Sequence, residues 1–262
     1  MSVSKISRHI REWIIDQANV GEESITDYLL WQIKLAVPNT VYKKWTKKQE
    51  NANGADWDWY IITNAYTAQL TIQAKRLKSP GKNYTGINHD SGNQINNLLQ
   101  IAAQKNFLPL FALYSREDGD ACRGKVTGEG VQIAAAQKVS ALHSAAITTH
   151  KIQTKDLLAD AIPLSCLFNC PSSGSGMNPQ TGIPTIFELY FDVQDNTTKF
   201  LVNGIPRHIQ FLLSEPPNTS EDTDDLLFSK EDGQQKDIEN FSVSKCGLLI
   251  SDLRKYSNDL YK

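Results

Sequence analysis

The chain has 262 residues, 40% hydrophobic and 21% charged, a composition that excludes a disordered chain and predicts a folded core without disulfides. Its 27 basic and 29 acidic side chains give a net charge of −2, which excludes a globally basic nucleic-acid coat but not a local basic patch. Because no run of about 18 apolar residues occurs, and the four cysteines follow no secretory signal, we expect a cytoplasmic protein with no membrane segment.

Two amphipathic helices are predicted at the start of the chain. Apolar residues recur at helical spacing from about residue 6 to residue 14, and again between Gly21 and Pro38. The polar and basic segment 43–54 that follows predicts a loop or a short bent strand.

A strand is predicted over residues 56–62, where the sequence is unusually aromatic. Period-two alternation puts Asp56, Asp58 and Tyr60 on one face of this strand and two tryptophans with an isoleucine on the other. A second strand over residues 69–77 has Gln73 and Lys75 on one face and apolar side chains on the other.

Further elements follow along the chain. We expect a helix from about Asn93, a strand at 108–114 that is buried on both faces, and a helix over 131–146. Later strands are predicted at 186–193 and 200–202. The expected fold class is therefore mixed α/β.

The patterns are denser in the first part of the chain than in the second. We therefore predict a core at 1–170 and an appended α+β extension at 171–262. Within the extension, PSSGSGMNPQTG predicts a flexible loop and EPPNTSEDTDD an acidic mobile insertion.

Charged side chains in the two predicted strands point to a functional site. A buried ion costs several kcal/mol unless it is paired or bound to a metal. Adjacent strands would resolve this cost if they brought four polar side chains to one face, namely Asp56, Asp58, Gln73 and Lys75. Glu22 or Glu23, at the start of the second helix, could add a carboxylate. Carboxylate and amide oxygens suit Mg²⁺ or Mn²⁺, which promote phosphodiester hydrolysis.

The segments that carry these residues are GEESITDYLL, GADWDWYI and LTIQAKRL, followed by QINNLLQIA and LPLFALY. In this order they resemble the PD-(D/E)xK (restriction-endonuclease-like) nuclease superfamily, most closely its Mrr-like variety, in which Gln-x-Lys replaces Glu-x-Lys. The resemblance covers residues 20–115. It implies a central mixed sheet flanked by helices in a nuclease core at 1–170. It also implies a Mg²⁺- or Mn²⁺-dependent endonuclease that hydrolyses DNA, with RNA not excluded.

The resemblance also implies roles for individual residues. The metal would be held by Asp56, the side-chain oxygen of Gln73, the carbonyl of Ala74 and Glu22. Asp58 is the alternative to Asp56, and Glu23 the alternative to Glu22. Lys75 would position and activate the attacking water, and Gln94 on the following helix would assist at the site.

Basic residues flank the proposed site on both sides in the sequence. Arg76 and Lys78 are expected to contact phosphates. For the cluster at 43–48, which contains Lys44 and Lys47, phosphate contact and a solvated loop both stay open.

Relatives of this kind are frequently effectors of prokaryotic antiphage defence, switched on by a partner protein or signal, and many act as homodimers. One alternative is a catalytically silent nucleic-acid-binding or assembly subunit with the same fold. A second is an ion-paired surface hairpin in which Asp58 bridges to Lys75. A third is a zinc-stabilised interaction protein that uses Cys122, Cys166 and Cys170.

Overall fold

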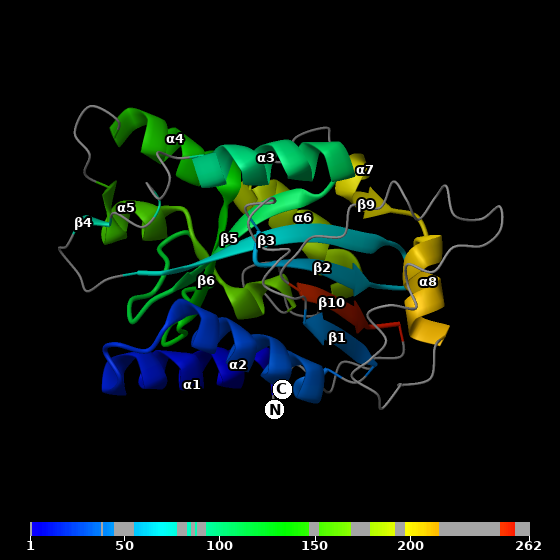
Figure 1. Cartoon of the computed structure of the whole chain (residues 1–262), viewed down its shortest axis with the longest axis horizontal. Helices are drawn as coiled ribbons and strands as arrows, with labels where there is room; N and C mark the ends of the chain where they lie inside the picture. Colours follow the sequence, from blue (N-terminus) through cyan, green and yellow to red (C-terminus); the bar gives the residue numbers. More distant parts are fainter. Residues whose placement is uncertain are drawn as a thin grey trace.

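A mixed sheet with helices on both of its faces organises the molecule, seen in the computed structural model in Figure 1. The structure describes residues 2–37, 39–44, 55–77, 83–84, 87, 93–146, 152–168, 179–191, 197–214 and 247–254. The expected mixed α/β class is confirmed. None of the helices in these ranges is long and apolar enough to cross a membrane.

The helices are α1 (Val3–Asp16), α2 (Glu22–Ala36), α3 (Asn93–Lys105), α4 (Ala136–Ala146), α5 (Thr154–Ala159), the 3₁₀ helix η3 (Leu164–Leu167), α6 (Pro179–Phe191), α7 (Thr197–Phe200) and α8 (Arg207–Ser214). The strands are β1 (Thr40–Lys44), β2 (Trp57–Ile62), β3 (Thr67–Arg76), β4 (Asn83–Tyr84), β5 (Leu108–Tyr114), β6 (Val131–Ala135), β7 (Ile152–Gln153), β8 (Ile162–Pro163), β9 (Leu201–Val202) and β10 (Gly247–Asp252).

Within the described ranges the main sheet has eight strands, with seven in the order β1-β10-β2-β3-β5-β6-β8 and β9 paired to β3. β10 runs parallel to β2, and β3 runs parallel to β5, whereas the other pairs in this sheet are antiparallel. Because β3 and β5 are parallel neighbours, their carboxyl ends meet at the same edge of the sheet. β4 and β7 form a separate two-stranded ribbon.

The predicted alternation along β2 and β3 is confirmed by the two sides of the core. Trp57, Trp59 and Ile61 of β2 pack with α1, α2 and α6, together with the alternating apolar residues of β3. Tyr60 and Ile62 instead pack on the opposite side, against α8 and the segment that ends α3. Each buried aromatic side chain of this kind removes about 150–250 Å² from water, so the two faces are fixed strongly.

Three predictions about elements are corrected by the structure. Residues 131–135 form strand β6 rather than the start of a helix, because this segment pairs with β5, and the helix α4 begins only at Ala136. The segment predicted as a strand at 186–193 is helical as far as Phe191, and residues 192–193 lie outside the described ranges. At 200–202, Phe200 ends α7 and only Leu201–Val202 form a strand, β9.

Strand β10 corrects the picture of an appended C-terminal part. It comes from residues 247–252 yet lies between β1 and β2 in the main sheet, and the Trp59 indole donates a hydrogen bond to Ser251 Oγ at 3.0 Å. These residues therefore belong to the principal sheet and not to a separate extension. Segment 43–54 contributes Lys43 and Lys44 to β1, and residues 45–54 lie outside the described ranges.

A fully buried carboxyl group joins the segment before β6 to η3. Glu129 is 0% exposed, and its Oε1 accepts a hydrogen bond from Ser165 Oγ at 2.6 Å. Burial raises the pKa of Glu129 above 4.5, and the hydrogen bonds from serine hydroxyls lower it by less. The folded protein therefore favours the neutral acid at this position more than the unfolded chain does.

This raised pKa predicts a pH-dependent stability. A carboxyl group whose folded pKa is raised stabilises the protein fully below its unfolded value near 4.5, and this contribution is lost as the pH rises through the folded value. Glu129→Gln, which mimics the neutral acid, is expected to remove this loss. Urea denaturation across the pH range should show that the free energy of unfolding of Glu129→Gln increases relative to that of the wild type as the pH rises. Glu12→Gln, on the exposed face of α1, is the control; equal pH profiles for Glu129→Gln and the wild type would contradict the prediction.

Candidate functional site

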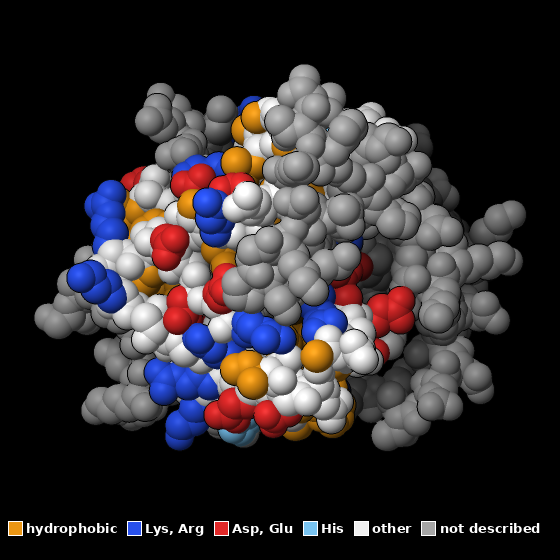
Figure 2. Space-filling model, turned by 90° about the vertical axis from the view of Figure 1, so that its left-hand side faces the viewer, with side chains coloured by type: hydrophobic (Ala, Val, Ile, Leu, Met, Phe, Trp, Pro, Cys, Tyr) orange, Lys and Arg blue, Asp and Glu red, His pale blue; other side chains and the backbone are white. Residues whose placement is uncertain are grey.

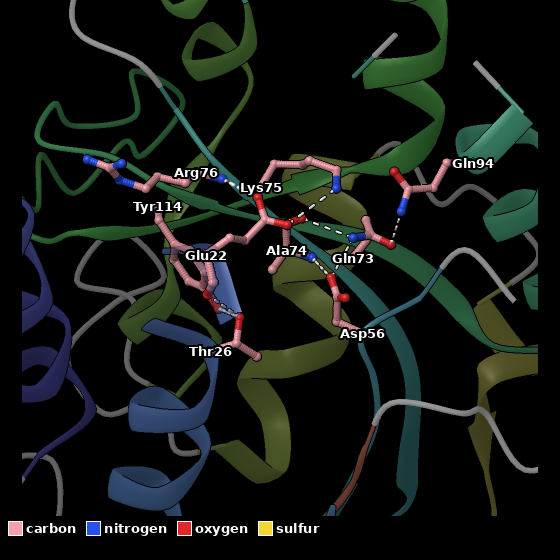
Figure 3. A network of polar contacts seen from close by, with 9 residues as sticks. All are labelled: Glu22, Thr26, Asp56, Gln73, Ala74, Lys75, Arg76, Gln94 and Tyr114. Atoms are coloured by element: carbon pink, nitrogen blue, oxygen red, sulfur yellow. Dashed lines mark hydrogen bonds and ion pairs between the residues drawn. The ribbon is translucent and has the colours of Figure 1, made fainter. Parts of the chain in front are cut away.

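Four separate segments meet at one end of the sheet (Figure 3). They are the first turn of α2, the residue just before β2, the last residues of β3 and the start of α3. The antiparallel register pairs Trp57 with Ile72, and the amide of Asp56 donates to the Ile72 carbonyl at 2.8 Å. The same register therefore brings Asp56 next to Gln73, in the arrangement of neighbouring strands hypothesised from the sequence.

The Asp56 carboxylate is the centre of a hydrogen-bonded cluster. Its Oδ2 accepts from Gln73 Nε2 at 2.5 Å and from the backbone amide of Ala74 at 2.6 Å. Gln73 Nε2 also donates to the carbonyl of Ala74 at 3.0 Å. Gln94, on the first turn of α3, donates from Nε2 to Gln73 Oε1 at 3.1 Å. The cluster thus joins β2, β3 and α3 through polar side chains.

The Glu22 carboxylate completes the network from the helix side. Its Oε1 lies 3.4 Å from Lys75 Nζ, and its Oε2 accepts from the backbone amide of Arg76 at 2.8 Å. Lys75 is only 8% exposed, whereas the Glu22 side chain is 32% exposed, so the pair is shielded from water on the lysine side only. Glu23, the alternative acid in the sequence, is exposed to solvent. The structure therefore brings Glu22, and not Glu23, to Lys75.

Two residues that the sequence did not reveal hold the first turn of α2 in place. Thr26 Oγ1 donates to the Glu22 carbonyl at 3.0 Å and lies 2.8 Å from the hydroxyl of Tyr114, at the end of β5. Since the Thr26 hydrogen is used on the carbonyl, the Tyr114 hydroxyl is the donor in this pair. Burial raises the pKa of Tyr114 well above its usual value, which keeps the phenol protonated and able to donate.

Asp58 lies on the same face of β2 as Asp56 but has a different partner. Its carboxylate is 2% exposed, and its Oδ2 lies 3.2 Å from Lys105 Nζ, at the end of α3. The other oxygen, Oδ1, has no hydrogen-bond partner among the described residues. The interpretation of a hairpin bridged by Asp58 and Lys75 is wrong, because each of these residues pairs with a different element.

The predicted phosphate-contacting residues are described only in part. The guanidinium of half-buried Arg76 donates to the carbonyl of Ala18 in the loop between α1 and α2. Lys44 ends β1 opposite Gly247, which puts its backbone at the same end of the sheet as Asp56, two strands and about 10 Å away. Lys47 and Lys78 lie outside the described ranges.

The donor atoms at this end of the sheet fit a hard divalent cation. They are oxygens: the carboxylates of Asp56 and Glu22 and the carbonyl of Ala74. Gln73 Nε2 lies between Asp56 Oδ2 and the Ala74 oxygen, so two acceptors already converge on one point. A half-turn of the amide would present Gln73 Oε1 there, and a matching turn of Gln94 would keep their hydrogen bond. Such an all-oxygen set suits Mg²⁺ or Mn²⁺.

Within the described ranges, no group of three or more histidine, cysteine, aspartate or glutamate side chains could hold a metal. The site proposed at this end of the sheet has two carboxylates, Asp56 and Glu22, and would need the amide and carbonyl oxygens as further ligands. Of the cysteines proposed for zinc, Cys122 and Cys166 are buried with their Sγ atoms 3.4 Å apart, and Cys170 lies outside the described ranges.

The fold and this site define a mixed α/β protein with an acidic and amide cluster, next to a buried lysine, at one end of an open mixed sheet. Residues 2–239 match the model of a family of unknown function, DUF6615, and the chain belongs to this family. No curated protein and no solved structure matches the chain.

Proposed function

We propose that this protein is a Mg²⁺- or Mn²⁺-dependent endonuclease of the PD-(D/E)xK (restriction-endonuclease-like) kind that hydrolyses DNA phosphodiester bonds. One observation carries the proposal: Glu22, Asp56, Gln73 and Lys75 come from three separate segments and lie together at one end of the sheet, where Asp56 bonds to Gln73 and Glu22 pairs with Lys75. These are the residue types, in the chain order, that the resemblance implies. A role as an effector of prokaryotic antiphage defence rests on that resemblance alone.

The ligands we assign to the cation are Asp56, Glu22, the Gln73 side-chain oxygen and the carbonyl of Ala74. A bound Mg²⁺ would act as a Lewis acid on a phosphate oxygen and lower the pKa of a water. Asp56 is held rigidly for this task because its Oδ2 accepts two short hydrogen bonds from β3. Gln94 orients the Gln73 amide from α3.

Lys75 supplies the positive charge that phosphodiester hydrolysis needs beside the scissile group. Its ammonium lies next to the Glu22 carboxylate in a poorly solvated position, where charge interactions are stronger than in water. From there Lys75 can hold a water through its donors and stabilise the negative charge that develops on the phosphate. Thr26 and Tyr114 fix the helix turn that carries Glu22, so they position the lysine indirectly.

A second candidate, a catalytically silent nucleic-acid-binding or assembly subunit, is favoured by a different observation. The network is internally satisfied, because Gln73 donates to both Asp56 and Ala74 while Glu22 and Lys75 pair with each other. A protein that only bound nucleic acid would keep these contacts for stability.

Incubation with nucleic acid distinguishes the two candidates. The purified full chain is mixed with supercoiled plasmid, linear duplex, single-stranded DNA or RNA, in Mg²⁺, in Mn²⁺ and in EDTA. The nuclease proposal predicts internal cleavage of DNA in the presence of metal and none in EDTA. DNA binding of equal strength with and without metal, with no cleavage of any substrate, would support the silent subunit instead.

A further inference from the structure

Two arginines, Arg76 and Arg116, lie at the carboxyl ends of the neighbouring strands β3 and β5. Arg76 is the last residue of β3, and it pairs in parallel register with Tyr114, the last residue of β5. The pairing continues as the amide of Leu77 donates to the carbonyl of Tyr114 at 2.8 Å. Arg116 follows only two residues after Tyr114, so both arginines leave the sheet at the same place. The carboxyl ends of parallel strands are a common location for bound ligands.

No carboxylate of the described residues neutralises this pair. Arg76 donates to the main-chain oxygen of Ala18, but its Nε has no acceptor among the described residues. Arg116 is half-buried and makes no hydrogen bond or ion pair with any residue that the structure describes. Two acids of the neighbouring segments are already engaged: Glu22 by Lys75 and the Arg76 amide, and Asp118 by Arg11 at 2.8 Å. Glu117, the next residue after Arg116, forms no ion pair with either arginine among the described residues.

The two guanidinium groups also affect each other. Burial, and then the positive charge of Arg116, lower the pKa of Arg76, in keeping with the pairing of Arg76 with Tyr114, two residues before Arg116. Figure 2 views this end of the molecule, and several lysine and arginine side chains gather near the middle of that face. Adjacent like charges repel each other unless an anion lies between them, and an unpaired arginine fork matches the oxygens of a phosphate.

The direction of the Arg76 side chain indicates where a phosphate bound to it would lie relative to the cluster at Asp56. Successive side chains of a strand point to opposite faces, so Arg76 points away from the face that carries Gln73 and Lys75. Figure 3 shows its guanidinium extending away from Asp56, on the far side of Glu22 from the amide cluster. A phosphate held by Arg76 is therefore not the one at Lys75.

We propose that Arg76 and Arg116 together bind a backbone phosphate of the nucleic acid that neighbours the scissile phosphate. This rests on the proposed nuclease function, and it adds Arg116 as a substrate-binding residue. The nucleic-acid strand then crosses the end of the sheet from Lys75, over Glu22, to the ends of β3 and β5. Bidentate hydrogen bonds from the two guanidinium groups to the phosphate would offset the repulsion between the two arginines.

The experiment measures binding without cleavage. Fluorescence anisotropy of a short labelled DNA duplex is recorded in EDTA over a range of salt concentrations for the wild type, Arg116→Ala and Arg116→Lys. Arg207→Ala, an exposed arginine on α8 at the opposite end of the molecule, is the matched control. We expect Arg116→Ala to weaken binding about tenfold and to reduce the slope of log affinity against log salt by about 1. Arg116→Lys keeps the charge and should retain most of that slope.

The outcomes separate this proposal from the nuclease proposal. DNA binding that depends on Arg116, in a protein that cleaves nothing, would support the phosphate contact and contradict the hydrolytic function. A second outcome is that the wild type cleaves DNA, while Arg116→Ala and Arg207→Ala both bind DNA with the affinity and salt slope of the wild type. This outcome would overturn the proposed phosphate contact of the two arginines and leave the nuclease proposal intact. Absence of DNA binding by the wild type would also overturn the pair.

Discussion

Replacing Lys75 with methionine is expected to lower the rate of metal-dependent DNA cleavage by about 100- to 1,000-fold, the usual effect of removing one positioned donor from a reacting centre. Methionine keeps the length of the buried stem but supplies no charge and no hydrogen-bond donor at the position beside Glu22. The measurement is the single-turnover rate of cleavage of a duplex in Mg²⁺, with the protein in excess over DNA.

The matched control for this variant is Lys138→Met. Lys138, on α4, forms an ion pair with Asp160 at 3.2 Å. Its replacement therefore also removes a lysine that pairs with an acid. We expect this control to cleave at the rate of the wild type. Equal rates for Lys75→Met and Lys138→Met would exclude Lys75 from the reaction.

The largest expected effect on stability comes from the buried ion pair between Asp58 and Lys105, the last residue of α3. Lys105→Met leaves the Asp58 carboxylate, which is 2% exposed, without its cation. Its Oδ1 already lacks a hydrogen-bond partner among the described residues, so little else offsets the charge. We expect the free energy of unfolding to fall by about 3–5 kcal/mol, measured by urea denaturation.

A double variant shows whether the cost comes from the unpaired charge. Asp58→Asn combined with Lys105→Met removes both charges and should recover most of the stability that Lys105→Met loses, because no ion stays buried. If Lys105→Met alone costs less than about 1 kcal/mol, the pair behaves as an exposed salt bridge, and the burial assigned to Asp58 is wrong.

The sequence predicted those features of the fold that follow from a local pattern of residues. Alternation in the aromatic strand set the two faces of β2, and the same rule set the faces of β3, because the period of a strand is independent of its partners. Alternation could not separate Asp56 from Asp58, since both point to the same face. Their partners separate them: Asp56 accepts from Gln73 and the Ala74 amide, whereas Asp58 pairs with Lys105, which is 47 residues away in the chain.

The elements that the sequence missed depend on distant partners. Strand β10 is a short apolar segment, and only its place between β1 and β2 identifies it as part of the sheet. In α6 the buried residues Ile183, Ile186, Phe187 and Tyr190 follow helical spacing, but a short apolar run does not distinguish a strand from a buried helix. The contact of Thr26 with Tyr114 spans 88 residues and has no local signature.

The measurement that tests the proposed centre most directly compares the two aspartates of the β2 segment. DNA cleavage in Mg²⁺ is recorded for the wild type, for Asp56→Asn and for the double variant Asp58→Asn with Lys105→Met. Because Asp56 lies in the network with Gln73 and Asp58 pairs with Lys105, we expect cleavage to be lost only in Asp56→Asn. Cleavage that survives Asp56→Asn, or that is lost in the double variant although it remains folded, would contradict the assignment of the centre to Glu22, Asp56, Gln73 and Lys75.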